Sequence, residues 1–222
     1  MDLLITVAVV AVALGFAALL LSWSLRRRAA FRSALEQRGW QLSRHGETTT
    51  VVPAAGDWTV TMTRSYAAQM SPPSTRIVTT VWTASTPAAP GAALVAGPAP
   101  PAQLRGLAAD LVGSATAAMT GWLGLDRVTG GLPLRAVPSA DDRLLVFATQ
   151  GYGPPGALTG LADAVSAWCE KHPAEREHPV VSINEAGICV RVRVDALRSV
   201  EQLEAFVDLG MRCRADIDRS RS

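Results

Sequence analysis

The pattern of apolar and polar positions divides the chain into one long apolar run and a remainder with the mixed pattern of a globular protein. Leu3 to Leu25 contains no charged residue. Because an α-helix rises about 1.5 Å per residue, about 20 apolar residues cross the hydrocarbon core of a bilayer. The run therefore predicts a transmembrane anchor within residues 1–25. A signal peptide is the alternative, but Asp2 and not a basic segment precedes the run, and Trp23 occupies the place where a cleavage site needs small residues.

The residues that follow the apolar run predict its orientation. Basic residues beside a span stay on the cytoplasmic side, and the amino terminus has none. We therefore expect a single-pass protein of the inner (plasma) membrane, with its N-terminus outside and its C-terminal domain in the cytoplasm. Near anionic lipid each basic residue adds about 1 kcal/mol of attraction, so these arginines are also a candidate membrane-surface cluster. They are Arg26, Arg27, Arg28 and Arg32.

Residues 26–86 predict a juxtamembrane helix followed by an antiparallel meander. Apolar residues from Ala30 to Leu35 recur at helical spacing and Gly39 suits a helix stop, so the span and this helix are candidates for one continuous rod. From Trp40 the period changes to two, which indicates short strands that leave one face of their sheet to solvent. The predicted strands lie at Trp40–Leu42, Thr48–Val52, Trp58–Thr63 and Arg76–Ala84.

The second half of the chain predicts a further lobe. Pro, Ala and Gly dominate residues 87–101, which are expected to be a linker, and residues 102–222 are expected to be an α+β lobe. Ser199 and Gln202 form a capping box for the last helix. The fold class is therefore α+β, with one transmembrane helix before a two-lobed module of antiparallel strands and amphipathic helices. We expect the chain from about Arg38 onward to fold alone. The other elements are helices at Gln103–Leu123 and Leu158–Lys171, and strands at Leu132–Val137, Arg143–Thr149, Pro179–Ile183 and Gly187–Val194.

Within residues 124–217 a strand pair precedes a leucine-rich helix. The hairpin PVVSINEAGICVRV and the helix VEQLEAFVDLG follow. This arrangement resembles uncharacterised bacterial single-pass membrane-anchored proteins with a cytoplasmic α+β domain. The resemblance implies the same fold and brings no activity.

Composition and charge exclude several classes of function. The 21 Lys and Arg residues nearly balance the 19 Asp and Glu residues, and we expect no nucleic-acid partner because that needs a clustered basic face. The three cysteines are an odd number without a C-x-x-C pair, which argues against a disulfide framework and a zinc knuckle. Free thiols suit a reducing cytoplasm.

The motifs that suggest chemistry each have a simpler interpretation. Residues 151–156 match G-x-G-x-x-G, but Pro154 and Pro155 lack the N–H groups that such a loop offers to a pyrophosphate. Cys169 and His172 have C-x-x-H spacing, whereas zinc needs four converging ligands. No serine lies in a G-x-S-x-G motif. We therefore predict no catalytic residue, no cofactor and no metal, and we do not expect an enzyme.

The sequence thus predicts a membrane-anchored cytoplasmic protein-interaction module. A module that binds a small molecule or a lipid headgroup at the membrane surface is the alternative. The expected partners are the lipid bilayer and, through a stripe of small residues on the anchor, a second copy or another membrane protein. Small residues let transmembrane helices approach closely. This candidate helix-contact stripe consists of Ala8, Ala11, Gly15, Ala18 and Ser22.

Overall fold

All strands of the described chain belong to one antiparallel sheet. The computed structural model describes residues 2–66, 76–85, 92–100, 134–139, 141–149 and 158–221. Within them, nine strands lie in the order β1-β2-β3-β4-β9-β8-β5-β7-β6, and each neighbouring pair is antiparallel. The strands are β1 (Trp40–His45), β2 (Thr48–Pro53), β3 (Trp58–Tyr66), β4 (Arg76–Ala84), β5 (Leu94–Pro98), β6 (Leu134–Val137), β7 (Leu144–Thr149), β8 (Val180–Asn184) and β9 (Gly187–Val192).

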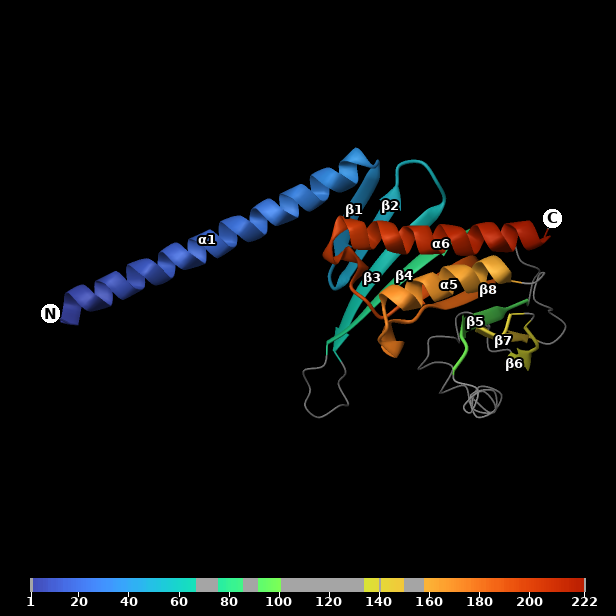
Figure 1. The fold of residues 1–222 in the computed structure, drawn as a ribbon. Coiled ribbons are helices and arrows are strands. Elements are labelled where there is room, and N and C mark those ends of the chain that lie inside the picture. The colour runs from blue at the N-terminus through green and yellow to red at the C-terminus, as the bar shows by residue number, and fades with distance from the viewer. Residues whose placement is uncertain are drawn as a thin grey trace.

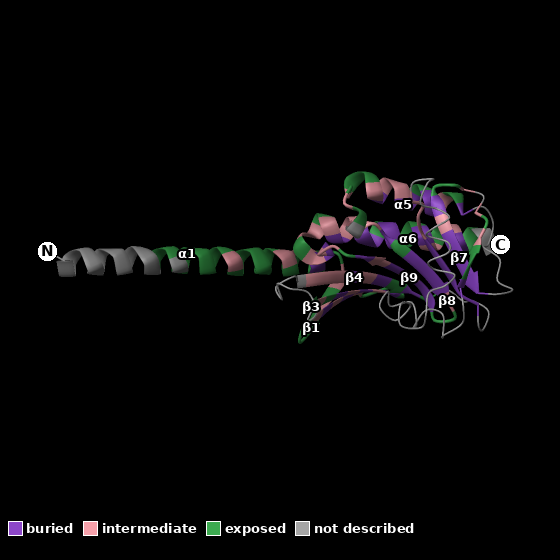
Figure 2. Cartoon of the chain, turned by 90° about the horizontal axis from the view of Figure 1, so that it is seen from below, coloured by how far each residue is buried: buried purple, intermediate pink, exposed green. Residues whose placement is uncertain are grey.

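Two helices, α5 (Thr159–Lys171) and α6 (Val200–Arg221), lie on one face of this sheet (Figure 1). Side chains alternate between the two faces of a strand, so every second residue points to these helices. These residues are apolar in the central strands, and they form the main core with the inner faces of α5 and α6 (Figure 2). The largest fully buried side chains of the core are Trp82, Phe206, Leu35, Met62, Leu94 and Leu161.

The contact between α6 and β4 requires a glycine. Gly210 of α6 lies directly over the ring of Trp82, and a Cβ atom at this position would come within 2.2 Å of the ring. The Trp82 side chain is completely buried. The absence of a side chain at Gly210 therefore sets how closely α6 approaches the sheet.

An aspartate from α6 caps the start of α5. Leu158, which precedes α5, has a left-handed φ of 49° and provides no side-chain cap. Instead, the Leu161 N–H donates a hydrogen bond of 2.8 Å to Oδ2 of Asp216. A negative charge at a helix N-terminus also interacts favourably with the helix dipole. Asp216 thus joins the two helices by a polar contact as well as by apolar packing.

The first helix, α1 (Asp2–Gln37), projects from the sheet and ends inside the domain (Figure 1). Leu35 is only 1% exposed and belongs to the main core, and Phe31 packs against that core. Arg38 forms an ion pair with Glu204 of α6. Gly39 takes φ +69°, and its N–H donates to the Glu36 carbonyl at 2.9 Å, which ends the helix as predicted.

We expected residues from about Arg38 onward to fold alone on the premise that the preceding helix contributes nothing to the core, and the burial of Leu35 contradicts this premise. A buried leucine contributes about 1.5–3 kcal/mol through removal of apolar surface from water. A chain without Leu35 would leave a cavity where α1, β1 and α6 meet. The last turns of α1 are therefore part of the domain.

The expected two-lobed arrangement is also wrong, because β4 pairs with β9 and the second half of the chain extends the sheet of the first half. The predicted linker, residues 87–101, contains β5, which lies between β8 and β7. Residues 86–91 and 101–133 lie outside the described residues, and so does the predicted helix Gln103–Leu123. The α+β class, the antiparallel pairing and the other predicted elements are confirmed.

The structure does not support the transmembrane helix predicted for Leu3–Leu25. Over the residues that the structure describes, no helix combines the length and the apolar character that a membrane crossing requires.

Candidate functional site

The exposed part of α1 differs from the rest of the described surface by its large apolar side chains. Between positions 16 and 25 six such side chains are 48–66% exposed, whereas the most exposed large apolar side chains of the described domain are Val180 (38%) and Met211 (43%). Large exposed apolar surface marks a site of contact with another molecule or a membrane. The six side chains and their exposed fractions are Phe16 (64%), Leu19 (66%), Leu20 (48%), Leu21 (62%), Trp23 (59%) and Leu25 (55%).

The four predicted basic residues follow this apolar stretch of α1. We call Arg26, Arg27, Arg28 and Arg32 the basic collar. All four side chains are exposed. The Arg27 guanidinium carbon lies 5.6 Å from the centre of the Trp23 ring, in cation–π geometry. In the described part of the chain, no salt bridge includes any of the four.

The small-residue stripe is described only in part. Gly15, Ala18 and Ser22 are exposed, and no neighbouring atom lies within 4 Å of a Cβ placed on Gly15. The Ser22 hydroxyl donates a hydrogen bond of 2.9 Å to the Leu19 carbonyl, which satisfies this hydroxyl within the helix. Ala8 and Ala11 lie in α1, but their side chains are outside the description. Contact of this stripe with another span stays a prediction.

The second candidate surface is the face of β2, β3 and β4 that points away from α5 and α6. Cross-strand pairs place threonines side by side here, with Thr63 between Thr48 and Thr79, and Thr61 between Thr50 and Val81. We call this surface the threonine face. It comprises Thr48, Thr50, Val52, Thr59, Thr61, Thr63, Ser65, Ile77, Thr79, Val81 and Thr83.

The threonine face carries no charged residue, and no described helix lies on it. Thr63, Ser65 and Thr83 are exposed, and the other members are half-buried. The buried threonines Thr49 and Thr80 belong to the opposite face. The predicted solvated face of the meander is thus confirmed. The sequence reasoning did not single out the threonine face, although threonine at alternate positions of three strands was a signal for it.

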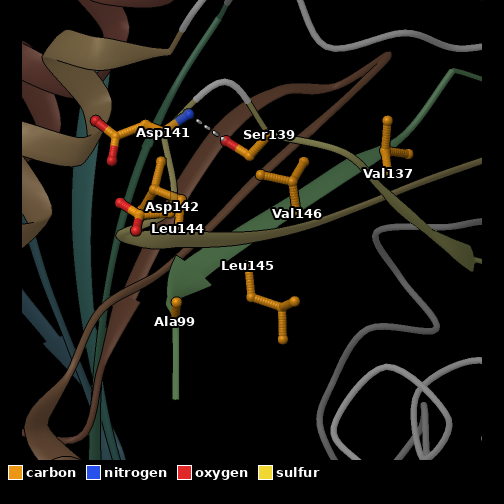
Figure 3. A pocket seen from close by; sticks show the side chains of 8 residues that line it. All are labelled: Ala99, Val137, Ser139, Asp141, Asp142, Leu144, Leu145 and Val146. Carbon is orange, nitrogen blue, oxygen red and sulfur yellow. Dashed lines mark hydrogen bonds between the residues drawn. The ribbon is translucent and has the colours of Figure 1, made fainter. Parts of the chain in front are cut away.

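An open hollow lies beside β6 and β7. Its volume is about 190 Å³, and Figure 3 shows Asp141 and Asp142 together at one end of it. Arg143 binds the Asp141 carboxylate through Nη2 at 2.6 Å and Nε at 3.0 Å, and these hydrogen bonds lower the pKa of Asp141. Ser139 Oγ accepts the Asp141 N–H, as a turn requires. The hollow is lined by Ala99, Val137, Ser139, Asp141, Asp142, Leu144, Leu145 and Val146.

The remaining motifs have structural roles or lie outside the described residues. His172 stacks on Trp168 with ring centres 4.2 Å apart, and its Nδ1 lies 3.5 Å from Oε2 of Glu177. Trp168 Nε1 donates to the Glu177 carbonyl at 3.0 Å. No group of three or more metal-ligating side chains occurs among the described residues. Cys169, Cys189 and Cys213 are free. The glycine-rich segment 151–156 is not described.

These features define a class: an α+β protein with one antiparallel sheet, helices on one of its faces, and a long N-terminal helix with an apolar surface and a basic collar. No protein-family model, curated protein or solved structure matches the chain.

Proposed function

We propose that this chain is a membrane-anchored module that binds other proteins in the cytoplasm through its threonine face. In this proposal Leu3–Leu25 crosses the membrane, the N-terminus lies outside, and the α+β domain lies on the side of the basic collar. Interface cores are depleted of charged side chains relative to ordinary protein surface. The observation that carries the proposed protein contact is the threonine face, on which β2, β3 and β4 present no charged side chain.

The proposed anchor rests on the sequence of α1 and on the exposure of its side chains. An uncharged run of this length is sufficient to span a bilayer with some tilt. The large apolar side chains from Phe16 to Leu25 find no cover within the described domain. Ser22 and Ser24 donate their hydroxyl hydrogens to carbonyls of the same helix, which reduces the cost of placing them in lipid.

An alkaline wash of isolated membranes tests the anchor. The full-length chain is expected to stay in the pellet, because alkaline extraction releases proteins that do not span the bilayer. Val10→Arg with Leu14→Arg should shift it to the supernatant, since each central arginine costs about 2.5–3.5 kcal/mol of insertion free energy. Val10→Leu with Leu14→Ile is the matched control and should behave as the wild type. Release of the wild type by the wash would contradict the anchor.

A photo-crosslinking amino acid at Thr61 tests the protein contact in native membranes. The full-length chain should give a discrete crosslinked product, and Thr50→Lys or Val81→Lys should remove it, because either substitution places a charge beside Thr61. The same crosslinker at Arg212, which is exposed on α6, serves as the control position. Equal products from both positions, or a product unaffected by the lysines, would contradict a specific contact on this face.

Recognition of lipid headgroups is the second candidate function. It is favoured by the basic collar, which adjoins the apolar surface of α1. The open hollow gives less support to small-molecule binding, because ligand pockets are concave and bury most of their ligand.

A further inference from the structure

The basic collar holds four positive charges close together. Arg32 lies six residues after Arg26, which is about 9 Å along the helix axis. Arg28 and Arg32 lie one turn apart on the same side of α1, and like charges at this spacing destabilise a helix. Asp2 is the only carboxylate that precedes Glu36 in the sequence. Glu36 lies one turn after Arg32, so the carboxylates of α1 balance at most a small part of the charge of the collar.

The position of the collar along α1 restricts what can provide the balancing charge. The apolar surface ends at Leu25, and Phe31 already packs against the core of the domain. With Leu3–Leu25 in the hydrocarbon, the collar lies at the depth of the headgroups, a layer about 5–8 Å thick on each side. Trp23 is at the matching boundary, where amphipathic rings are favoured, and Arg27 extends over its ring.

We propose that the basic collar binds anionic phospholipid headgroups and thereby holds the domain against the membrane surface. The inference rests on the proposed anchoring of α1 and names the lipid partner of that anchor. Arg26, Arg27 and the pair Arg28 and Arg32 point in three directions around the helix, which allows more than one headgroup to be bound, since successive residues are rotated by about 100°. Guanidinium groups suit this partner because their N–H groups bind phosphate oxygens in pairs. Because α1 continues to Leu35 inside the core, headgroup binding also fixes the height of the domain.

Native mass spectrometry of the detergent-solubilised full-length chain tests this proposal. The probe is an equal mixture of phosphatidylglycerol and phosphatidylcholine with identical acyl chains. The wild type should retain on the order of tenfold more phosphatidylglycerol than phosphatidylcholine. Replacing the four collar arginines by glutamine should bring the ratio close to one, whereas replacing them by lysine should keep most of the preference. Equal retention of the two lipids by the wild type would overturn the proposal.

A matched variant separates the effect of the basic collar on lipid binding from the effect of net charge. Four exposed arginines elsewhere can be changed to glutamine, which lowers the formal charge from +2 to −2 as the collar variant does. This control should keep the preference for phosphatidylglycerol, and its loss would overturn the proposal. Loss of the wild-type preference in millimolar inorganic phosphate would do the same, because the collar would then bind soluble phosphate. The control positions are Arg44, Arg135, Arg198 and Arg212.

Flotation of the same wild-type preparation with vesicles of pure phosphatidylcholine tests the anchor separately from the lipid site. Flotation without a preference for phosphatidylglycerol would leave the anchor in place and overturn the lipid site alone. A chain that does not float would overturn both the anchor and the lipid site that rests on it. Flotation together with the preference supports both.

Discussion

At the scale of single residues, the hydroxyls of two buried threonines, Thr80 and Thr149, bind partners that are distant in the sequence. The hydroxyl of Thr80, which is completely buried on β4, donates to the Val194 carbonyl at 2.5 Å and accepts from the Ala196 N–H at 3.4 Å. Thr149 Oγ1 accepts the Ala93 N–H at 3.0 Å, beside the start of β5. Burial of a hydroxyl without such partners costs about 1–3 kcal/mol. These threonines therefore help to fix which loops lie against which strands.

Cys213 is predicted to be the least reactive of the three thiols. Its side chain is completely buried in α6, and burial, with a smaller contribution from Asp216, raises the pKa of the thiol to about 12. The thiolate is the reactive form, so alkylation at pH 8 should modify the partly exposed Cys169 first and Cys213 only on unfolding. Peptide mass spectrometry after timed alkylation measures this order. Modification of Cys213 as fast as Cys169 in the native state would contradict the packing of α6.

The ion pair between Asp57 and Arg214 predicts a pH dependence of stability. Arg214 Nη1 and Nη2 lie 2.5 and 2.9 Å from the two carboxylate oxygens, and this hydrogen bonding lowers the pKa of Asp57 below 3.8. A depressed pKa gives stability that is present above about pH 4 and is lost as the pH falls through the folded-state value. Asp57→Asn should therefore lower the urea midpoint at pH 7 and change it less at pH 3.

The size of that effect should be small, because Asp57 is about half exposed, and exposed pairs contribute less than about 1 kcal/mol. Asp142→Asn is the control. It removes an exposed carboxylate that has no salt bridge in the described part of the chain. Its effect on the urea midpoint should therefore be similar at pH 7 and pH 3. An Asp57→Asn effect that is larger at pH 3 than at pH 7 would contradict the assigned sign.

At the scale of elements, local pattern predicted most of the structure. β-Branched residues predicted β2, and alternating residues predicted β3 and β4. The capping box placed the start of α6, where the Gln202 N–H donates to Ser199 Oγ at 3.2 Å. β5 was missed because its few apolar residues stand among Pro, Ala and Gly, and only pairing with β7 and β8 makes it a strand. The threonine face depends on strand register, because the register decides which threonines lie side by side. Residue propensities along one strand do not predict this register.

The contact between α6 and β4 predicts a large effect at Gly210. Gly210→Ala would place a methyl group within 2.2 Å of the Trp82 ring, so α6 must move away from the sheet. We expect a loss of about 1–3 kcal/mol in the free energy of unfolding, which is typical of an overpacked core. Gly97→Ala is the control, because its nearest neighbour would be the Pro179 carbonyl oxygen at 3.7 Å. Similar urea midpoints for Gly210→Ala and the wild type would contradict this packing.

At the scale of the whole molecule, the long helix and the sheet form one unit. Long-range pairing of β4 with β9 joins the two halves of the chain, and sequence reasoning divided them because a Pro- and Ala-rich segment lies between them. The end of α1 enters the core through Leu35, and Arg38 binds Glu204 of α6. In the proposed arrangement the domain follows the orientation of the anchor. The contacts of Leu35 and Arg38 thus help to set the position of the threonine face relative to the anchor, although these residues are distant from that face.

A pair of fusions to the full-length chain tests whether α1 anchors a cytoplasmic domain. A reporter that is active only in the cytoplasm is fused after Ser222 in one protein and before Met1 in the other, and activity is measured in intact cells. We expect activity for the fusion after Ser222 and none for the fusion before Met1, because the basic collar lies on the C-terminal side of the apolar run. The reverse pattern, or activity from both fusions, would contradict it.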